Sequence, residues 1–202
     1  MRNFKKTLSF LLSTVIIVSS VAGVGTTVFA ATDEHTYKNF KYRILDDNTA
    51  EICGYTGKNA VVTVPDSIDS KPVTSIGRTA FYSGKIKEVT IPNTVRSIKW
   101  WAFYGCESLE KINLNFGLKT VGYGAFMNCK NLKSVSIPMS VTQICDDSFA
   151  VSCSTKKGVF DTYSKQTIST QQYSTDSLFT LEGYSGTVAE KYCNDNSLNF
   201  VS

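Results

Sequence analysis

Histidine is almost absent from the sequence, with His35 as the single example among 202 residues. Zinc sites built from several histidines and two-histidine iron sites need more imidazole ligands than this chain contains. A Ser-His triad needs one firmly placed histidine. His35 instead falls just after the cleavage site proposed below, where chains are usually poorly ordered. The shortage therefore argues against several common catalytic centres.

Other chemistry-bearing patterns are also missing. The six cysteines form no C-x-x-C pair of the kind that binds zinc, and they stand at positions 53, 106, 129, 145, 153 and 193. The Gly-Tyr-Ser-Gly run at 183–186 lacks the G-x-S-x-G spacing of a nucleophile elbow. Asp146 and Asp147 are neighbours whose side chains diverge in an extended segment. We therefore predict no catalytic residue, no metal ligand and no cofactor.

Blocks of like charge are lacking as well. The formal net charge is +4, but Arg2, Lys5 and Lys6 lie in segment 1–30, which contains no acidic residue. Removing these three from the 21 basic residues leaves 18 against 17 acidic residues, a net charge of +1. Nucleic-acid binding depends on clustered cations, so the sequence predicts no nucleic-acid partner.

Segment 1–30 matches a signal peptide. A basic start precedes an apolar run from Leu8 to Val24, and small residues surround a cleavage site after Ala30. An uncleaved membrane anchor is the rival interpretation, because the run is near the lower length limit of a spanning helix. Serines within the run and the cleavage site favour removal. We expect a secreted or loosely surface-associated protein that is not inserted in a membrane after cleavage.

A repeat with one constant step runs through the remaining chain. Ile91, Leu114 and Ile137 are separated by this step. It also relates three further columns: Val95, Leu118 and Val141; Ile98, Val121 and Ile144; and Phe103, Phe126 and Phe149. An earlier copy fits with a step that is shorter by one position and contains Val73, Ile76, Ala80 and Phe81. A period of this length with leucine-like positions predicts a leucine-rich-repeat solenoid.

Each repeat is expected to contribute one short strand. Segments 89–91, 112–114 and 135–137 alternate apolar and polar residues, a period of two that is typical of strands. The Ala-Phe pair of each repeat is expected on the returning arm, filling the interior. One unit leaves its apolar face exposed, whereas stacked units with strands about 4.8 Å apart bury it continuously. The predicted fold is a short, curved solenoid of about four to five repeats.

The repeat resembles a known bacterial family. From Ile91 to Leu109 the pattern is I-P-x-x-V-x-x-I-x-x-x-A-F-x-x-C-x-x-L, which is similar to the BspA-like (type-5) leucine-rich repeat. Segments 40–64 and 183–192 resemble the usual ends of that family. The departures are Cys145, Cys153 and Cys193. The resemblance implies a bacterial surface or secreted protein, with adhesion among the functions of a diverse family.

Two caps are expected to close the array. After a signal peptide at 1–30, the repeat domain spans 31–202, and its predicted parts are an amino-terminal cap at 37–64, regular repeats at 65–153 and a carboxyl-terminal cap at 177–202. A hairpin turning at Asp46-Asp47-Asn48 is predicted to cover the open first strand. At the other end, a capping box of Thr187 and Glu190 is predicted to start a short helix that runs to about Asn196.

Residues 154–176 fall outside this pattern and have two interpretations. They form either a surface loop or a degenerate repeat, and we prefer the repeat because long structureless loops are uncommon in compact domains. The cysteines also leave alternatives open. Cys106 and Cys129 share an interior column within disulfide range, but side chains that point the same way are expected to remain buried thiols.

Two sets of outward-facing residues are candidates for binding. Trp100 and Tyr123 share a variable column, with Trp101 beside them, and are predicted to form an aromatic platform unless the rings pack on neighbouring turns. The second set comprises the polar residues that flank the buried strand positions: Glu88, Thr90, Lys111, Asn113, Ser134 and Ser136.

Together these features predict a monomeric, non-catalytic, exported binding module. Its expected partner is an extracellular protein or glycan. One alternative is a passive structural or spacer domain without a specific ligand. Another is a carbohydrate-binding accessory protein that uses the exposed aromatic residues Trp100 and Tyr123.

Overall fold

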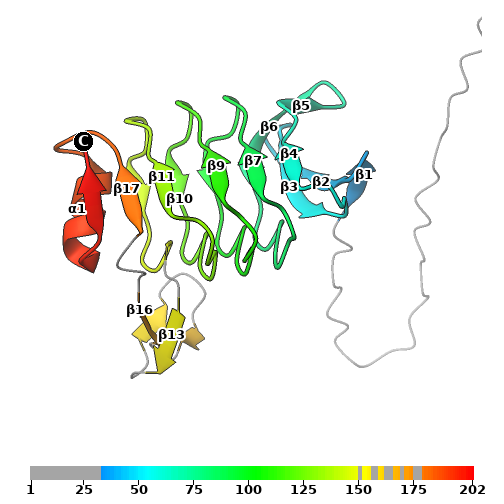
Figure 1. The fold of residues 1–202 in the computed structure, drawn as a ribbon. Coiled ribbons are helices and arrows are strands. Elements are labelled where there is room, and N and C mark those ends of the chain that lie inside the picture. Colours follow the sequence, from blue (N-terminus) through cyan, green and yellow to red (C-terminus); the bar gives the residue numbers. More distant parts are fainter. Residues whose placement is uncertain (1–32, 150–151, 156–158, 162–165, 169–170, 175–178) are drawn as a thin grey trace, which may run out of the picture. The chain divides into compact units, whose positions relative to one another are not determined.

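The chain winds into a solenoid of about five turns (Figure 1). This computed structural model describes residues 33–149 and 179–202 in full, and between them the strands β13 (Ser152–Thr155), β14 (Val159–Asp161), β15 (Gln166–Ile168) and β16 (Gln171–Ser174). The regular turns contribute one strand to a front ladder and a second strand to a back ladder. The predicted solenoid is therefore confirmed, and the second strand in each turn is an addition to the prediction.

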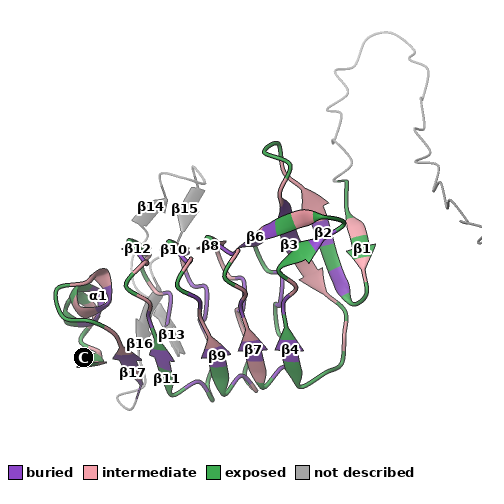
Figure 2. Cartoon of the chain, turned by 90° about the horizontal axis from the view of Figure 1, so that it is seen from above, coloured by how far each residue is buried: buried purple, intermediate pink, exposed green. Residues whose placement is uncertain are grey.

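The front ladder consists of short parallel strands in two sheets. The first sheet contains β4 (Val61–Thr63), β7 (Glu88–Thr90) and β9 (Lys111–Asn113), and the second contains β11 (Ser134–Ser136), β17 (Thr180–Glu182) and β18 (Asn199–Val201). In β4, β7, β9, β11 and β17 a buried central residue alternates with more exposed neighbours (Figure 2), whereas the central residue of β18 is half-buried. β7, β9 and β11 each start one residue earlier than predicted, although Ile91 N still donates to Asn113 O at 3.0 Å.

The back ladder joins the regular turns to the amino-terminal cap. Its parallel strands are β6 (Lys71–Ile76), β8 (Ser97–Ile98), β10 (Thr120–Val121) and β12 (Gln143–Ile144). A short strand, β5 (Ser67–Ile68), pairs antiparallel with β6. Each of β8, β10 and β12 is too short to show a period-two pattern, which explains why the sequence did not reveal these strands.

The core lies between the ladders and is built from the repeating columns. Phe81, Phe103, Phe126 and Phe149 are all buried and stack with ring centroids 4.8 to 5.2 Å apart and nearly parallel planes. Phe179 extends the stack at 5.4 Å. Apolar burial and offset stacking of rings both stabilise this arrangement. The repeat spacing therefore becomes a physical column in which each turn covers the aromatic ring of the preceding one.

The amino-terminal cap contains the predicted hairpin and one further strand. β2 (Phe40–Ile44) pairs antiparallel with β3 (Ala50–Tyr55), and β1 (His35–Tyr37) adds to the outer side of β2. β3 then pairs in parallel with β6. The hairpin thus covers the first strand of the back ladder, a ladder that the sequence did not predict.

The carboxyl-terminal cap is the predicted helix, α1 (Val188–Asn196), which buries Ala189, Tyr192 and Cys193. The capping box is wrong. Thr187 occupies the N-cap position, but its hydroxyl donates to Tyr184 O at 2.6 Å and makes no cap hydrogen bond. Glu190 accepts from Gly186 N at 2.7 Å, one residue before the N-cap. The hydroxyl and the backbone N–H of Thr187 both donate to Tyr184 O, so they stabilise the turn that precedes α1.

The segment that interrupts the repeats has its own strand pairing. β13 pairs antiparallel with β16, and β14 pairs antiparallel with β15. β11 pairs directly with β17, in the register Val135 to Leu181. The described strands of this segment therefore add no strand to the front ladder.

The described cysteines are free thiols, as expected for the interior column. Cys106 and Cys129 are buried, and their Sγ atoms donate to Phe81 O at 2.9 Å and to Phe103 O at 3.2 Å. Burial raises the pKa of Cys106 to about 11 and that of Cys129 well above its ordinary value. These two side chains are small packing elements with little thiolate character. The side chain of Cys153 lies outside the described residues.

Candidate functional site

The polar residues predicted from the strands lie together on the outer surface of the front ladder. The register pairs Glu88 with Lys111 and Thr90 with Asn113. Ser134 and Ser136 occupy the equivalent positions of β11, and Ser136 pairs with Glu182 of β17. The sequence therefore placed these six side chains correctly on one face, because a three-residue strand with a buried centre must turn both flanking residues outward.

Hydrogen bonds within this face satisfy much of its polarity. Lys111 Nζ lies 3.0 Å from Glu88 Oε1, and Asn113 Nδ2 donates to the same oxygen at 3.0 Å. Asn113 also donates to Thr90 Oγ1 at 3.2 Å. The hydrogen bonds from Lys111 and Asn113 lower the pKa of the Glu88 carboxyl. The result is a polar surface of mixed charge, which produces no strong long-range field of one sign.

An exposed apolar row borders the front ladder and was not predicted from the sequence. Phe116, Met139 and Tyr184 closely follow the ends of β9, β11 and β17 and are 76%, 63% and 52% exposed. Phe116 and Met139 occupy the same position in consecutive turns, and Tyr184 follows the next strand of the ladder. We call these three residues the apolar rim. Their common place after the strand, with Phe116 and Met139 separated by one repeat step, was the available signal.

The predicted aromatic platform is partly packed between turns. Trp100, Trp101 and Tyr123 are all half-buried. The Trp101 ring lies edge-on to the Tyr123 ring with centroids 6.1 Å apart, and the Arg78 guanidinium lies 4.8 Å from the Trp101 centroid. A Cβ on Gly124 would lie 2.6 Å from the Trp101 ring, so the ring covers this glycine. Trp101 thus serves at least in part as packing on the neighbouring turn.

Backbone geometry explains the orientation of Trp101. Its φ of 54° lies in the left-handed region, and the same column has similar values in other turns, at Thr79, Gly124 and Asp147. A bulky residue seldom adopts this conformation. The geometry of the repeat imposes this conformation on Trp101. Contacts with Arg78 and Tyr123 then stabilise the orientation of its ring.

A second aromatic pair on the returning arm is more exposed. Tyr82 and Tyr104 stack with centroids 5.4 Å apart and planes 8° from parallel. Tyr82 is 57% exposed, and Asn128 Nδ2 donates to the Tyr104 hydroxyl at 3.1 Å. This pair was also missed, although both tyrosines directly follow the buried phenylalanine of the repeat.

A match to a known protein family identifies the relatives of this chain. The model of the BspA type leucine rich repeat region matches residues 63–198 with six copies. The chain belongs to the BspA-type leucine-rich repeat family. The resemblance predicted from the repeat pattern is therefore confirmed.

Solved structures of bacterial leucine-rich repeat proteins are similar to this BspA-type chain. A protein from Bacteroides capillosus ATCC 29799 is 31% identical with a TM-score of 0.54, over 56% of this chain and 88% of that one. A leucine rich cell surface protein from Faecalibacterium prausnitzii A2-165 is 26% identical with a TM-score of 0.50, over 76% of this chain and 46% of that one. The chain therefore spans less than half of the second protein. A comparison with curated proteins gave no match.

A buried carboxylate in this BspA-type chain was missed by the sequence analysis. Glu51 is 1% exposed and forms ion pairs with Arg43 and Lys99. Its Oε2 also accepts from Ser75 Oγ at 2.7 Å. Burial alone would raise the pKa of Glu51, but the hydrogen bonds from Lys99 and Ser75 and the charges of Lys99 and Arg43 outweigh it and lower the pKa. Through these contacts Glu51 links Arg43 of the amino-terminal cap to Ser75 of β6 and to Lys99 of the following turn.

The described residues contain neither a cluster of metal ligands nor a membrane-spanning helix. Among the described residues, no three histidine, cysteine, aspartate or glutamate side chains group closely enough to hold a metal ion. The described part of the chain also contains no helix of the length and apolarity needed to cross a membrane. The predicted signal peptide and its cleavage site after Ala30 lie outside the described residues.

Proposed function

We propose that this BspA-type chain is a non-catalytic module that acts outside the cell and binds a protein partner through the apolar rim and the adjoining front ladder. The observation that carries the proposal is the exposure of Phe116, Met139 and Tyr184 in successive turns. Single exposed apolar side chains are ordinary, but a row of them marks an interaction surface.

The surroundings of the apolar rim support a protein partner. Protein interfaces combine apolar anchors, often aromatic or methionine, with a polar and hydrated border. Here the anchors are Phe, Met and Tyr, and the outward side chains of β9, β11 and β17 supply the border. The phenylalanine column holds the turns in fixed register, so the anchors are presented on a rigid frame that loses little entropy on binding.

The two alternatives fit these contacts less well. A passive spacer gains nothing from three exposed apolar side chains, which carry a risk of aggregation. A glycan site at Trp100 and Tyr123 requires an open ring face. Tyr123, however, is half-buried and receives the Trp101 ring at an interplanar angle of 72°.

Binding of purified residues 31–202 to immobilised extracellular proteins and to a glycan array tests the proposal. We expect a protein target, and the variant Phe116→Ser/Met139→Ser/Tyr184→Ser should weaken its binding at least about tenfold, as loss of apolar anchors commonly does. The replaced side chains are exposed, so the circular dichroism spectrum should not change.

The matched control is Trp100→Ala/Tyr123→Ala, which removes the other candidate surface. Loss of binding in this control with retention in the rim variant would contradict the proposal and favour the aromatic platform. Binding to no protein and no glycan would favour a spacer. A signal confined to the glycan array would assign this chain to carbohydrate recognition instead.

A further inference from the structure

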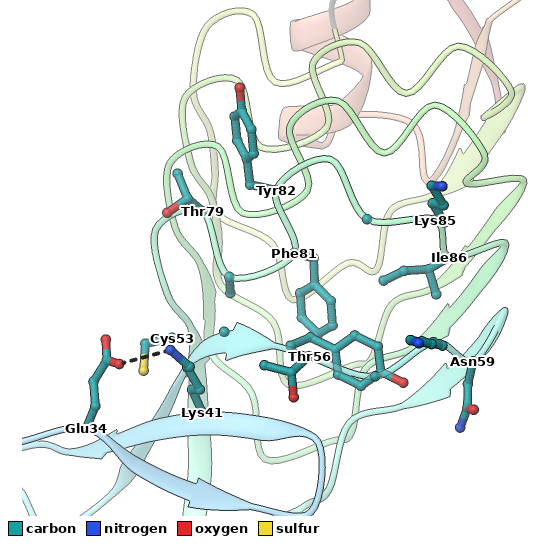
Figure 3. Close-up of a pocket in the computed structure, with 16 residues that line it drawn as sticks. Glu34, Lys41, Cys53, Thr56, Asn59, Thr79, Phe81, Tyr82, Lys85 and Ile86 are labelled. Atoms are coloured by element: carbon teal, nitrogen blue, oxygen red, sulfur yellow. Dashed lines mark ion pairs between the residues drawn. The ribbon is translucent and has the colours of Figure 1, made fainter.

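A groove lies between the amino-terminal cap and the first regular turn of the returning arm. It encloses about 330 Å³ and is lined on the cap side by residues 53–59 with Glu34 and Lys41, and on the repeat side by residues 79–82 and 84–86. Figure 3 shows Thr79 and Tyr82 on one side of it and Lys85 and Asn59 on the opposite side, with Thr56 and the Phe81 ring between them. The volume suits one or two sugar rings better than an extended protein surface.

The side wall of the groove carries an aromatic ring with an open face. Tyr104 covers one face of Tyr82 at 5.4 Å, and Tyr82 is nevertheless 57% exposed. Tyr55 of the cap packs against Phe81 with ring centroids 5.5 Å apart, so the cap residue that corresponds to Tyr82 is Thr56, which has no ring. The stacked pair of tyrosines therefore ends at the groove. An aromatic face next to water is a platform on which the C–H face of a sugar ring can lie.

The charge of the lining is unbalanced. Lys41 pairs with Glu34 at 3.7 Å. Within the described part of the chain, neither Lys58 nor Lys85 has an ion-pair partner, and both line the groove. Two unpaired ammonium groups beside hydroxyl and amide groups favour a ligand that has a negative charge and several hydrogen-bonding oxygens.

We propose that this groove binds an anionic sugar residue of a glycan, with its ring on the open face of Tyr82 and its acidic group near Lys58 and Lys85. Thr56, Asn59 and Thr79 line the same space and supply polar groups for the ring hydroxyls. The site is separate from the apolar rim and does not depend on it, so the chain would bind a protein and an acidic glycan through different surfaces.

Isothermal titration of residues 31–202 with three tetrasaccharides tests this proposal: hyaluronan, which carries carboxylates, chondroitin sulfate, which carries carboxylates and sulfates, and chitotetraose, which is neutral. We expect at least one anionic tetrasaccharide to bind about tenfold more tightly than chitotetraose. Binding of both would assign recognition to the carboxylate, and binding of chondroitin sulfate alone would assign it to the sulfate. Equal affinity for all three, or no binding, would overturn the proposal.

Four variants locate the site. Tyr82→Ala and Lys58→Gln/Lys85→Gln should each weaken binding about tenfold, while Tyr82→Phe should bind as the unaltered protein does because it keeps the ring. Lys130→Gln is the matched control, since Lys130 is an exposed lysine that pairs with Glu107 at 2.6 Å on another part of the surface. An effect of Lys130→Gln equal to that of the groove variants would show non-specific attraction and overturn the assignment. All replaced side chains are exposed, so folding should be retained.

Discussion

The two ends of the solenoid are closed by different chemistry. At the amino-terminal end the hairpin of β2 and β3 continues the back ladder by hydrogen bonds, and the buried Glu51 links Arg43 of the cap to Lys99 of a later turn. At the carboxyl-terminal end α1 covers the last turn with Ala189, Tyr192 and Cys193. Backbone pairing occurs at both ends, because β18 pairs with β17 after α1, but the buried charge belongs to the amino-terminal cap and the buried helix face to the carboxyl-terminal cap.

This difference shows that the two exposed ends of a repeat array can be covered by different elements. The first turn exposes strand edges, which a further strand can satisfy. The last turns expose the side of the aromatic column, where Tyr192 lies edge-on to Phe149 with centroids 5.9 Å apart. An apolar helix suits that surface because it satisfies its own backbone hydrogen bonds. The two caps should therefore respond differently to truncation and to acid.

The largest effect should follow loss of apolar contact at the carboxyl-terminal end. Tyr192→Ala removes a buried ring from the phenylalanine column and is expected to lower the free energy of unfolding by about 3 kcal/mol. Urea unfolding followed by circular dichroism measures the change. Tyr184→Ala is the matched control, because that ring is exposed and should contribute little. A small effect of Tyr192→Ala would show that the helix is dispensable for closing the array.

A smaller effect is expected from the charge at the amino-terminal end. Glu51→Gln removes the carboxylate but leaves Arg43 and Lys99, which are 44% and 40% exposed and can turn toward water. We therefore expect a loss of about 2 kcal/mol at neutral pH, less than for a fully buried ion pair. Glu110→Gln, which breaks an exposed pair with Lys87, is the control and should change stability little. Equal losses of stability in the two variants would show that Glu51 contributes no more than an exposed ion pair.

Much of this architecture could be predicted because the repeat makes burial periodic. Columns such as Phe103, Phe126 and Phe149 fixed the register of the turns, and the residues flanking Val89 and Ile112 then had to face outward. The cap hairpin was predictable from its alternation and its turn. A period in sequence becomes a column in space whenever neighbouring turns stack in register.

The remaining features depend on contacts between distant residues. Glu51 looks like a surface residue in an alternating strand, and only the approach of Lys99, from a later turn of the solenoid, makes its burial favourable. The apolar rim could have been found from the shared position of Phe116 and Met139, but exposure after a strand depends on the geometry of the turn. Tyr82 lines a groove only because the cap leaves a space beside it, which the sequence around Tyr82 does not show.

The contribution of Glu51 to the amino-terminal cap should depend on pH, whereas that of Tyr192 to the carboxyl-terminal cap should not. The pKa of Glu51 is lowered in the folded chain, so its contribution to stability is present above the ordinary pKa and is lost as pH falls through the lowered one. The stability difference between Glu51→Gln and the unaltered protein should shrink from neutral pH to about pH 3, whereas the difference caused by Tyr192→Ala should remain. Unfolding curves over this range measure both. Parallel losses in the two variants would contradict the distinction between a charged and an apolar cap.

The smallest predicted effect concerns the start of α1. Because the Thr187 hydroxyl donates to Tyr184 O instead of capping the helix, Thr187→Ala should cost only about 0.5 kcal/mol, and Thr187→Ser should cost less because it keeps the donor. Thermal unfolding of both variants measures this difference. A loss of about 2 kcal/mol, typical of a strong N-cap, would show that the hydroxyl caps the helix in solution. The carboxyl-terminal end would then also depend on a polar contact, and the contrast between the two caps would be one of degree.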